Sequence, residues 1–71
     1  MTNCYKLKVG FKVNPLEEVD FYFTSTLDKS EIMSDITSAF KFGEIYLAGC
    51  DTAINMADVS WFRLEWESCY E

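Results

Sequence analysis

The sequence predicts a single α+β domain over residues 1–71. One antiparallel β-sheet of about four strands carries one α-helix packed on one face, in the order β-β-α-β-β. Residues 5–13 and 59–67 alternate apolar and polar side chains, as strands with one buried face do. Residues 27–43 carry a helical pattern between them. A length of 71 residues suits one small domain, in which the sheet must bury its apolar face against the helix.

The first two strands are predicted to form an antiparallel hairpin. Apolar side chains occupy every second position from Tyr5 to Val13, and lysines occupy most positions between them. Residues 19–25 alternate again. Residues 14–18 interrupt the pattern, because Pro15 has no N–H to donate to a strand ladder. A connection this short between two alternating segments is typical of a hairpin.

The helix is predicted from its ends as well as from its apolar face. Asp28 is a favourable N-cap, and Glu31 lies three residues later, which makes a capping box. Ile32 and Ile36 begin one apolar face, and the opposite face is polar. Gly43 suits the left-handed residue that ends a helix.

The chain after the helix is predicted to return to the sheet. Residues 44–48 form a short strand with Ile45 and Leu47 facing the core and Tyr46 facing outward. Residues 53–56 form a brief extended segment. The last strand, residues 59–67, places three side chains on the core face: Phe62, Leu64 and Trp66. An alternative is that the strands curl into a small half-barrel around the helix. The pattern does not predict the order of strands in the sheet.

The outward face of the sheet is the predicted functional surface. A single helix covers one side of the sheet and leaves the other side open. Three aromatic residues on that side are more than a solvated face needs, and exposed aromatics mark contact sites. Asp20 of the second strand is mixed in among them, and Glu17 and Glu18 form an acidic stretch in the connection before that strand. The predicted partner-binding residues are Tyr22, Tyr46, Trp61, Arg63, Glu17, Glu18 and Asp20.

Four interpretations of this face remain open. A register shift of one residue in one strand would bury these side chains. The face could instead mediate self-association, which we expect in so apolar a small chain, with 49% hydrophobic residues. It could be a protein-binding hot spot built on Trp61, Tyr22 and Arg63. It could also stack a nucleotide or a single-stranded nucleic acid on its aromatic rings.

The net charge of −6 narrows the choice of partner. It disfavours binding to long nucleic acids and to anionic membranes. It suits a basic protein partner, mimicry of nucleic-acid charge, or solubility without further function. The negative charge argues less strongly against binding of a small anionic nucleotide. We therefore expect a protein partner first.

No residue pattern indicates catalysis, a metal or a cofactor. The chain has no histidine, so a cysteine nucleophile would lack its usual base. Cys4, Cys50 and Cys69 are too few and too widely spaced for a zinc site or a disulfide scaffold. No apolar run approaches the roughly 20 residues of a membrane span. We expect a cytoplasmic protein with free thiols that is not an enzyme.

Residues 53–62 carry a resemblance to a group of small proteins. Ile54, Asn55, Val59 and Phe62 stand in a pattern that resembles the ending of small β-β-α-β-β proteins of Gram-positive bacteria, their phages and mobile elements. These proteins are mostly non-enzymatic and include acidic anti-CRISPR-type inhibitors. The resemblance implies a role as an antagonist of a host system, and it assigns no role to any residue.

These observations together predict a non-catalytic acidic binding protein that engages a macromolecular partner. The resemblance makes an inhibitor of a host defence protein, encoded by a phage or a mobile element, the leading interpretation. The alternatives are a protein that sequesters a small anionic nucleotide and a structural subunit of an oligomer.

Overall fold

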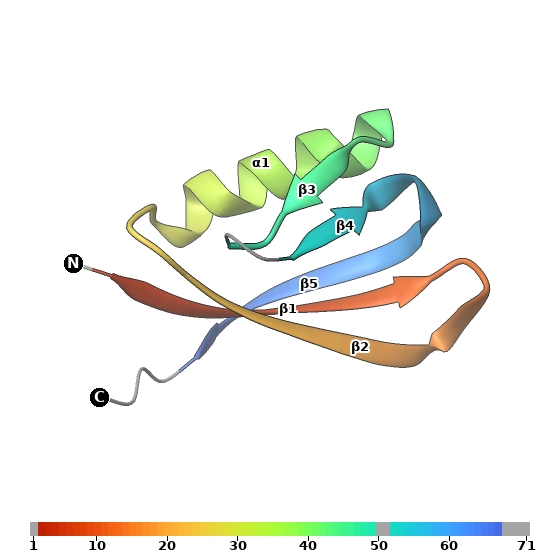
Figure 1. Cartoon of the computed structure of the whole chain (residues 1–71), viewed down its shortest axis with the longest axis horizontal. Helices are drawn as coiled ribbons and strands as arrows, with labels where there is room; N and C mark the ends of the chain where they lie inside the picture. Colours follow the sequence, from red (N-terminus) through yellow and green to blue (C-terminus); the bar gives the residue numbers. More distant parts are fainter. Residues whose placement is uncertain (1, 50–51, 68–71) are drawn as a thin grey trace.

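The computed structural model describes residues 2–49 and 52–67. It confirms the α+β class and the order of elements, but its five strands form two sheets instead of one. A three-stranded sheet has the order β2-β1-β5, and β3 and β4 form a separate two-stranded sheet (Figure 1). The elements are β1 (Asn3–Phe11), β2 (Asn14–Ser25), α1 (Lys29–Phe42), β3 (Ile45–Leu47), β4 (Ala53–Asn55), the 3₁₀ turn η1 (Met56–Asp58) and β5 (Val59–Glu67).

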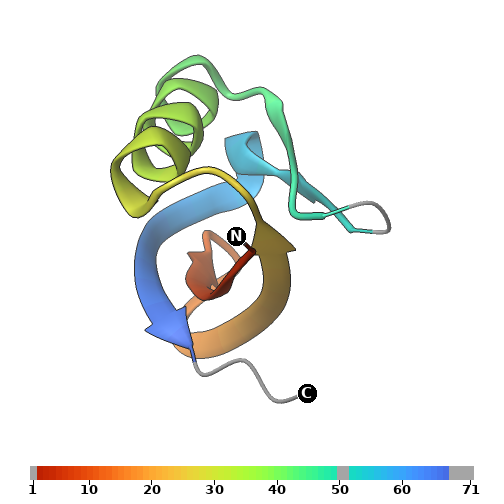
Figure 2. The same ribbon diagram turned by 90° about the vertical axis from the view of Figure 1, so that its left-hand side faces the viewer.

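The direction of the strands explains why one face of the sheet is covered. β1 runs antiparallel to both β2 and β5, so β2 and β5 run in the same direction. Strands that share a direction need a crossover connection of a dozen or more residues. The chain from α1 to η1 makes this crossover. Figure 2 shows α1 and the β3–β4 pair on the same side of the strongly curved three-stranded sheet.

The core lies between the three-stranded sheet and the crossover. Its side chains alternate along β1, as the sequence predicts, and its largest fully buried members come from every layer: Tyr5, Leu7, Val9, Ile32, Ile36, Met56 and Val59. The hydroxyl of Tyr5 donates to the carbonyl of Leu27 at 2.7 Å, which satisfies the one polar group of that side chain.

Both predicted ends of the helix are confirmed. Asp28 is the N-cap, and its Oδ1 accepts the backbone N–H of Glu31 at 2.9 Å. This bond and the hydroxyl of Ser30 hold the pKa of Asp28 below its ordinary value of 3.8. Gly43 has a φ of 66°, which is the left-handed conformation that favours glycine.

The predicted orientation of β3 is wrong. Tyr46 is half-buried and packs edge-to-face with Phe23, their ring centroids 6.4 Å apart. Ile45 and Leu47 are 57% and 67% exposed. Tyr46 pairs with Ile54 of β4, which is buried, so this side of the small sheet faces the core. A shift of one position turns every side chain of a strand to the other face. Burial and the charge of Asp35 raise the pKa of Tyr46.

The first hairpin also differs from its prediction. β1 ends at Phe11, and Lys12 and Val13 form the turn, so Val13 lies outside the strand. β2 begins at Asn14, although Pro15 lies in it. At the other end of the sheet, Trp66 stacks on Tyr5 with their ring centroids 4.9 Å apart, yet it remains more than half exposed and not in the core as predicted.

Cys4 is engaged in a disulfide bond, so the expectation of free thiols is wrong for this residue. The other two cysteines, Cys50 and Cys69, lie outside the described residues. No helix in the described parts of the chain is long and apolar enough to cross a membrane.

Candidate protein-binding surface

The open face of the three-stranded sheet presents most of the predicted binding residues in three rows across the strands. β1 supplies the central member of each row. Lys8 lies between Asp20 and Arg63, and Lys6 lies between Tyr22 and Glu65. The third row contains Glu18, Gly10 and Trp61. Since Leu7 and Val9 point into the core, alternation along β1 turns Lys6 and Lys8 to the open face.

Tyr46 does not belong to this face. It lies on the core side of the small β3–β4 sheet. The three aromatic rings expected to form a single platform are therefore divided between two parts of the molecule. Tyr22, which is 65% exposed, keeps its predicted place on the open face.

Ion pairs hold the charged side chains of the open face in place. Lys6 lies 3.4 Å from Glu65, and Lys8 lies 3.6 Å from Glu18. Arg63 lies 3.8 Å from Glu65. A hydrogen bond from Lys6 to Glu65 raises the pKa of Lys6. Burial favours a higher pKa for Glu65, but the hydrogen bond and charge of Lys6, with Lys8 and Arg63, outweigh it and lower that pKa.

Trp61 crosses the sheet and ties β5 to β2. Its indole Nε1 donates to the carbonyl oxygen of Pro15 at 2.8 Å. The ring lies directly over Gly10 of the central strand, where a Cβ would overlap the indole. Glycine at position 10 therefore makes room for the ring. Trp61 therefore positions the start of β2, and its role in partner binding stays a prediction.

The bond from Trp61 holds an irregular segment at the start of β2. Glu18 pairs with Gly10, but Asn14 pairs with Phe11, so the residues between them have no partner on β1. Such a bulge re-aims side chains at the end of a hairpin. The side-chain amide of Asn14 also donates to Glu17 at 3.2 Å. The bond from Trp61 to Pro15 and the bond from Asn14 to Glu17 together hold this segment in place.

The result is an apolar hairpin tip, defined here as residues 13–17. Val13 is 97% exposed and Leu16 is 94% exposed. The tip lies at one end of the long axis of the molecule (Figure 1). Glu17 belongs to it, and Glu18 and Asp20 follow along β2. A small hollow of about 290 Å³ opens beside Val13, between Phe11 and Val19.

The sequence predicted the acidic residues of this surface but missed its two aliphatic ones. Val13 continues the alternation of β1, so the pattern assigned it to the buried face. Leu16 lies in the segment interrupted by Pro15 and received no role. The available signal was local: an aliphatic side chain between a proline and two acidic residues is poorly placed for burial.

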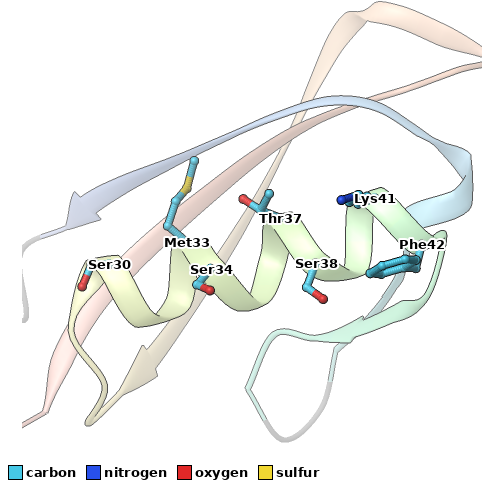
Figure 3. A pocket seen from close by; sticks show the side chains of 7 residues that line it. All are labelled: Ser30, Met33, Ser34, Thr37, Ser38, Lys41 and Phe42. Atoms are coloured by element: carbon cyan, nitrogen blue, oxygen red, sulfur yellow. The ribbon is translucent and has the colours of Figure 1, made fainter.

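A second hollow, of about 530 Å³, runs along the outer side of α1 (Figure 3). It is lined by small hydroxyl side chains such as Ser34 and Ser38 and by Met33 and Phe42. In Figure 3 these side chains point outward from a single helix and do not converge on one point. The side chains that line this hollow therefore do not form a convergent set of polar groups around a ligand.

A third hollow, of about 460 Å³, is lined by Lys12 and Lys41. It lies where the β1–β2 turn meets the end of α1 and η1. Gly43, which ends α1, also lines it. The described residues therefore do not form the three-ring platform expected for the nucleotide alternative, because Tyr46 lies apart from Tyr22 and Trp61. Nucleotide binding itself stays a prediction.

Within residues 2–49 and 52–67, no three histidine, cysteine, aspartate or glutamate side chains gather closely enough to hold a metal ion. The hairpin tip and the acidic residues that follow it on β2 remain the surface with the clearest recognition features. In comparisons with family models, curated proteins and solved structures, nothing matches this chain.

Proposed function

We propose that this chain is a non-catalytic binding protein that engages a protein partner through its hairpin tip. One observation carries the proposal: Val13 and Leu16 are almost fully exposed on a segment that Trp61 holds in place. Burying an aliphatic side chain of this size stabilises a contact by about 1.5–3 kcal/mol. Because the tip is already fixed, little conformational entropy is lost when a partner covers it.

The surroundings of the tip support a partner with basic groups. Glu17, Glu18 and Asp20 follow Leu16 along β2, and the whole chain has a net charge of −6. An apolar centre with a polar rim is the usual composition of a protein interface. Complementary charge speeds encounter and selects partners more than it adds affinity.

The finer proposal is that the partner is a host defence protein and that this chain inhibits it. The support is the resemblance of residues 53–62 to small proteins of phages and mobile elements. A rigid, protruding hairpin on a small acidic domain suits an inhibitor, since such a domain can occupy a basic site without performing chemistry there. Self-association and a cytoplasmic location remain predictions beside this proposal.

Affinity capture from a bacterial lysate with matched variants tests the binding surface. We expect the double variant V13S/L16S to retain about tenfold less of any specific partner than the wild type, because both anchors are removed. The control variant I45S/L47S removes two exposed aliphatic side chains on β3 and should retain the partner fully. Circular dichroism establishes that both variants are folded. Equal capture by V13S/L16S and wild type would remove the tip from the proposal.

A plaque assay tests the inhibitor role. Bacteria that express the wild-type chain should admit a phage that their defence system otherwise restricts, and bacteria that express V13S/L16S should not. Unchanged plaque counts with the wild-type chain across a panel of defence systems would reject inhibition while leaving the binding proposal intact.

A further inference from the structure

The outer edge of β2 is unpaired in the described part of the chain. β2 is the first strand of the order β2-β1-β5, so β1 is its one neighbour in the sheet. Beyond the bulge, the pairing with β1 is regular from Glu18 to Ser25. The opposite edge of the same stretch therefore presents a row of backbone N–H and C=O groups that β1 does not use. Such an edge is a template for the addition of another strand.

The side chains of this edge favour one kind of added strand. β2 has three acidic residues and no basic one. On the open face, Glu18 and Asp20 alternate with the core-facing side chains of Val19 and Phe21, which are only partly buried. A strand laid along the edge would meet negative charge on one face and apolar surface on the other.

The inner edge of β2 already shows a complementary strand. β1 places Lys8 opposite Asp20, and the Lys8 ammonium lies 3.6 Å from Glu18. On the core face, β1 places Val9 opposite Val19 and Leu7 opposite Phe21. Alternating basic and apolar residues therefore match the side chains of β2 on both faces of the sheet.

We propose that the free edge of β2 binds an extended segment of the partner in which lysine or arginine alternates with apolar residues. This inference rests on the proposed function and names the kind of segment that the partner presents. A second copy of this chain is a poorer occupant. Antiparallel pairing of two β2 strands would bring their acidic side chains together across the new contact, and like charges opposite each other are destabilising.

Binding of short synthetic peptides tests the proposal on the intact chain. We expect a peptide that alternates lysine with valine to bind and to slow hydrogen exchange at the β2 amides that do not bond β1. A peptide of the same length that alternates glutamate with valine should not bind. Equal binding of both peptides, or slowed exchange elsewhere than β2, would overturn the proposal.

Matched neutralising variants test the role of charge. E18Q/D20N should weaken binding of the lysine peptide by about three- to tenfold. D35N/E44Q changes the net charge equally on the helix and the following loop, so it should bind as the wild type does. Equal weakening by both variants would show an effect of overall charge and would overturn the proposed edge.

Two further outcomes separate this inference from its alternatives. V13S/L16S should still bind the lysine peptide, so failure of the hairpin tip and failure of the edge are distinguishable. Concentration-dependent protection of the β2 amides without any peptide would show that a second copy occupies the edge, and it would overturn the proposed occupant.

Discussion

Gly10 and Trp61 act as one structural unit at the residue scale. The indole lies over the glycine and bonds Pro15 beyond it, so a single side chain of β5 spans the whole three-stranded sheet. The strand pattern placed Trp61 on the open face. It could not show that the adjacent strand offers a glycine for the ring to cover, because that contact depends on register across the sheet. The sequence therefore predicted Trp61 as a binding residue but did not predict its hydrogen bond to Pro15 or its contact with Gly10.

Substitution of Gly10 by alanine should destabilise the fold. The added Cβ would overlap the indole of Trp61, and overpacking of this kind costs about 1–3 kcal/mol. Urea unfolding followed by circular dichroism measures the change in the free energy of unfolding.

A double-mutant cycle provides the control for Gly10. In a Trp61→Ala background the ring is absent, and G10A should cost little. An equal cost of G10A in both backgrounds would show that its effect does not come from the contact with the indole.

At the scale of elements, the sequence predicted features that depend on neighbouring residues correctly and a feature that depends on long-range packing wrongly. The helix ends depend on residues within one turn, such as Asp28 with Glu31, so the sequence predicted them correctly. The orientation of β3 depends on its pairing with β4 across a turn and on packing over Phe23. Alternation within three strand residues cannot distinguish the two faces, because Ile45, Tyr46 and Leu47 are all apolar or aromatic.

The observed orientation of the β3–β4 pair predicts that substitution of Ile54 destabilises the fold far more than substitution of Ile45. Ile54 is almost fully buried, so Ile54→Ala should lower the free energy of unfolding by about 2–5 kcal/mol. Ile45 is exposed, so Ile45→Ser should change it by no more than about 0.5 kcal/mol. Both values come from urea unfolding under identical conditions. A larger effect at Ile45 than at Ile54 would restore the orientation expected from the sequence.

At the scale of the whole molecule, two features stand out: the grouping of acidic residues on β2 and the disulfide bond of Cys4. The acidic residues were evident from composition, but their grouping on β2 needed the strand to begin at Asn14. The disulfide at Cys4 is more typical of oxidising compartments than of the cytoplasm. The spacing of three cysteines did not predict it, because spacing along a chain does not reveal proximity in the fold.

Stability should be highest on a plateau between about pH 4.5 and pH 10.0. The pKa of Asp28 is lowered from 3.8 and that of Glu65 from 4.5, so their stabilisation is complete above these values and is lost as the pH falls through the lower folded values. The pKa of Tyr46 is raised from 10.0, so its stabilisation is lost as the pH rises above that value. Urea midpoints measured across pH provide the profile.

Two variants test which residues cause the loss of stability in acid and in alkali. Asp28→Ser keeps a capping oxygen but has no charge, so the loss of stability in acid should become shallower. Tyr46→Phe removes the ionisable hydroxyl, so the loss in alkali should become shallower. Profiles identical to the wild type would show that other groups control the pH dependence.

The position of Trp61 also gives the protein a built-in optical probe. Its indole touches both the central strand and the bulge that presents Leu16, so its emission depends on the geometry of the hairpin tip. The chain has two tryptophans, and replacing Trp66 by phenylalanine leaves Trp61 as the only tryptophan, which can be excited selectively over the four tyrosines. Occupancy of the tip could then be followed by intrinsic fluorescence in real time, without attaching a dye to the surface under study.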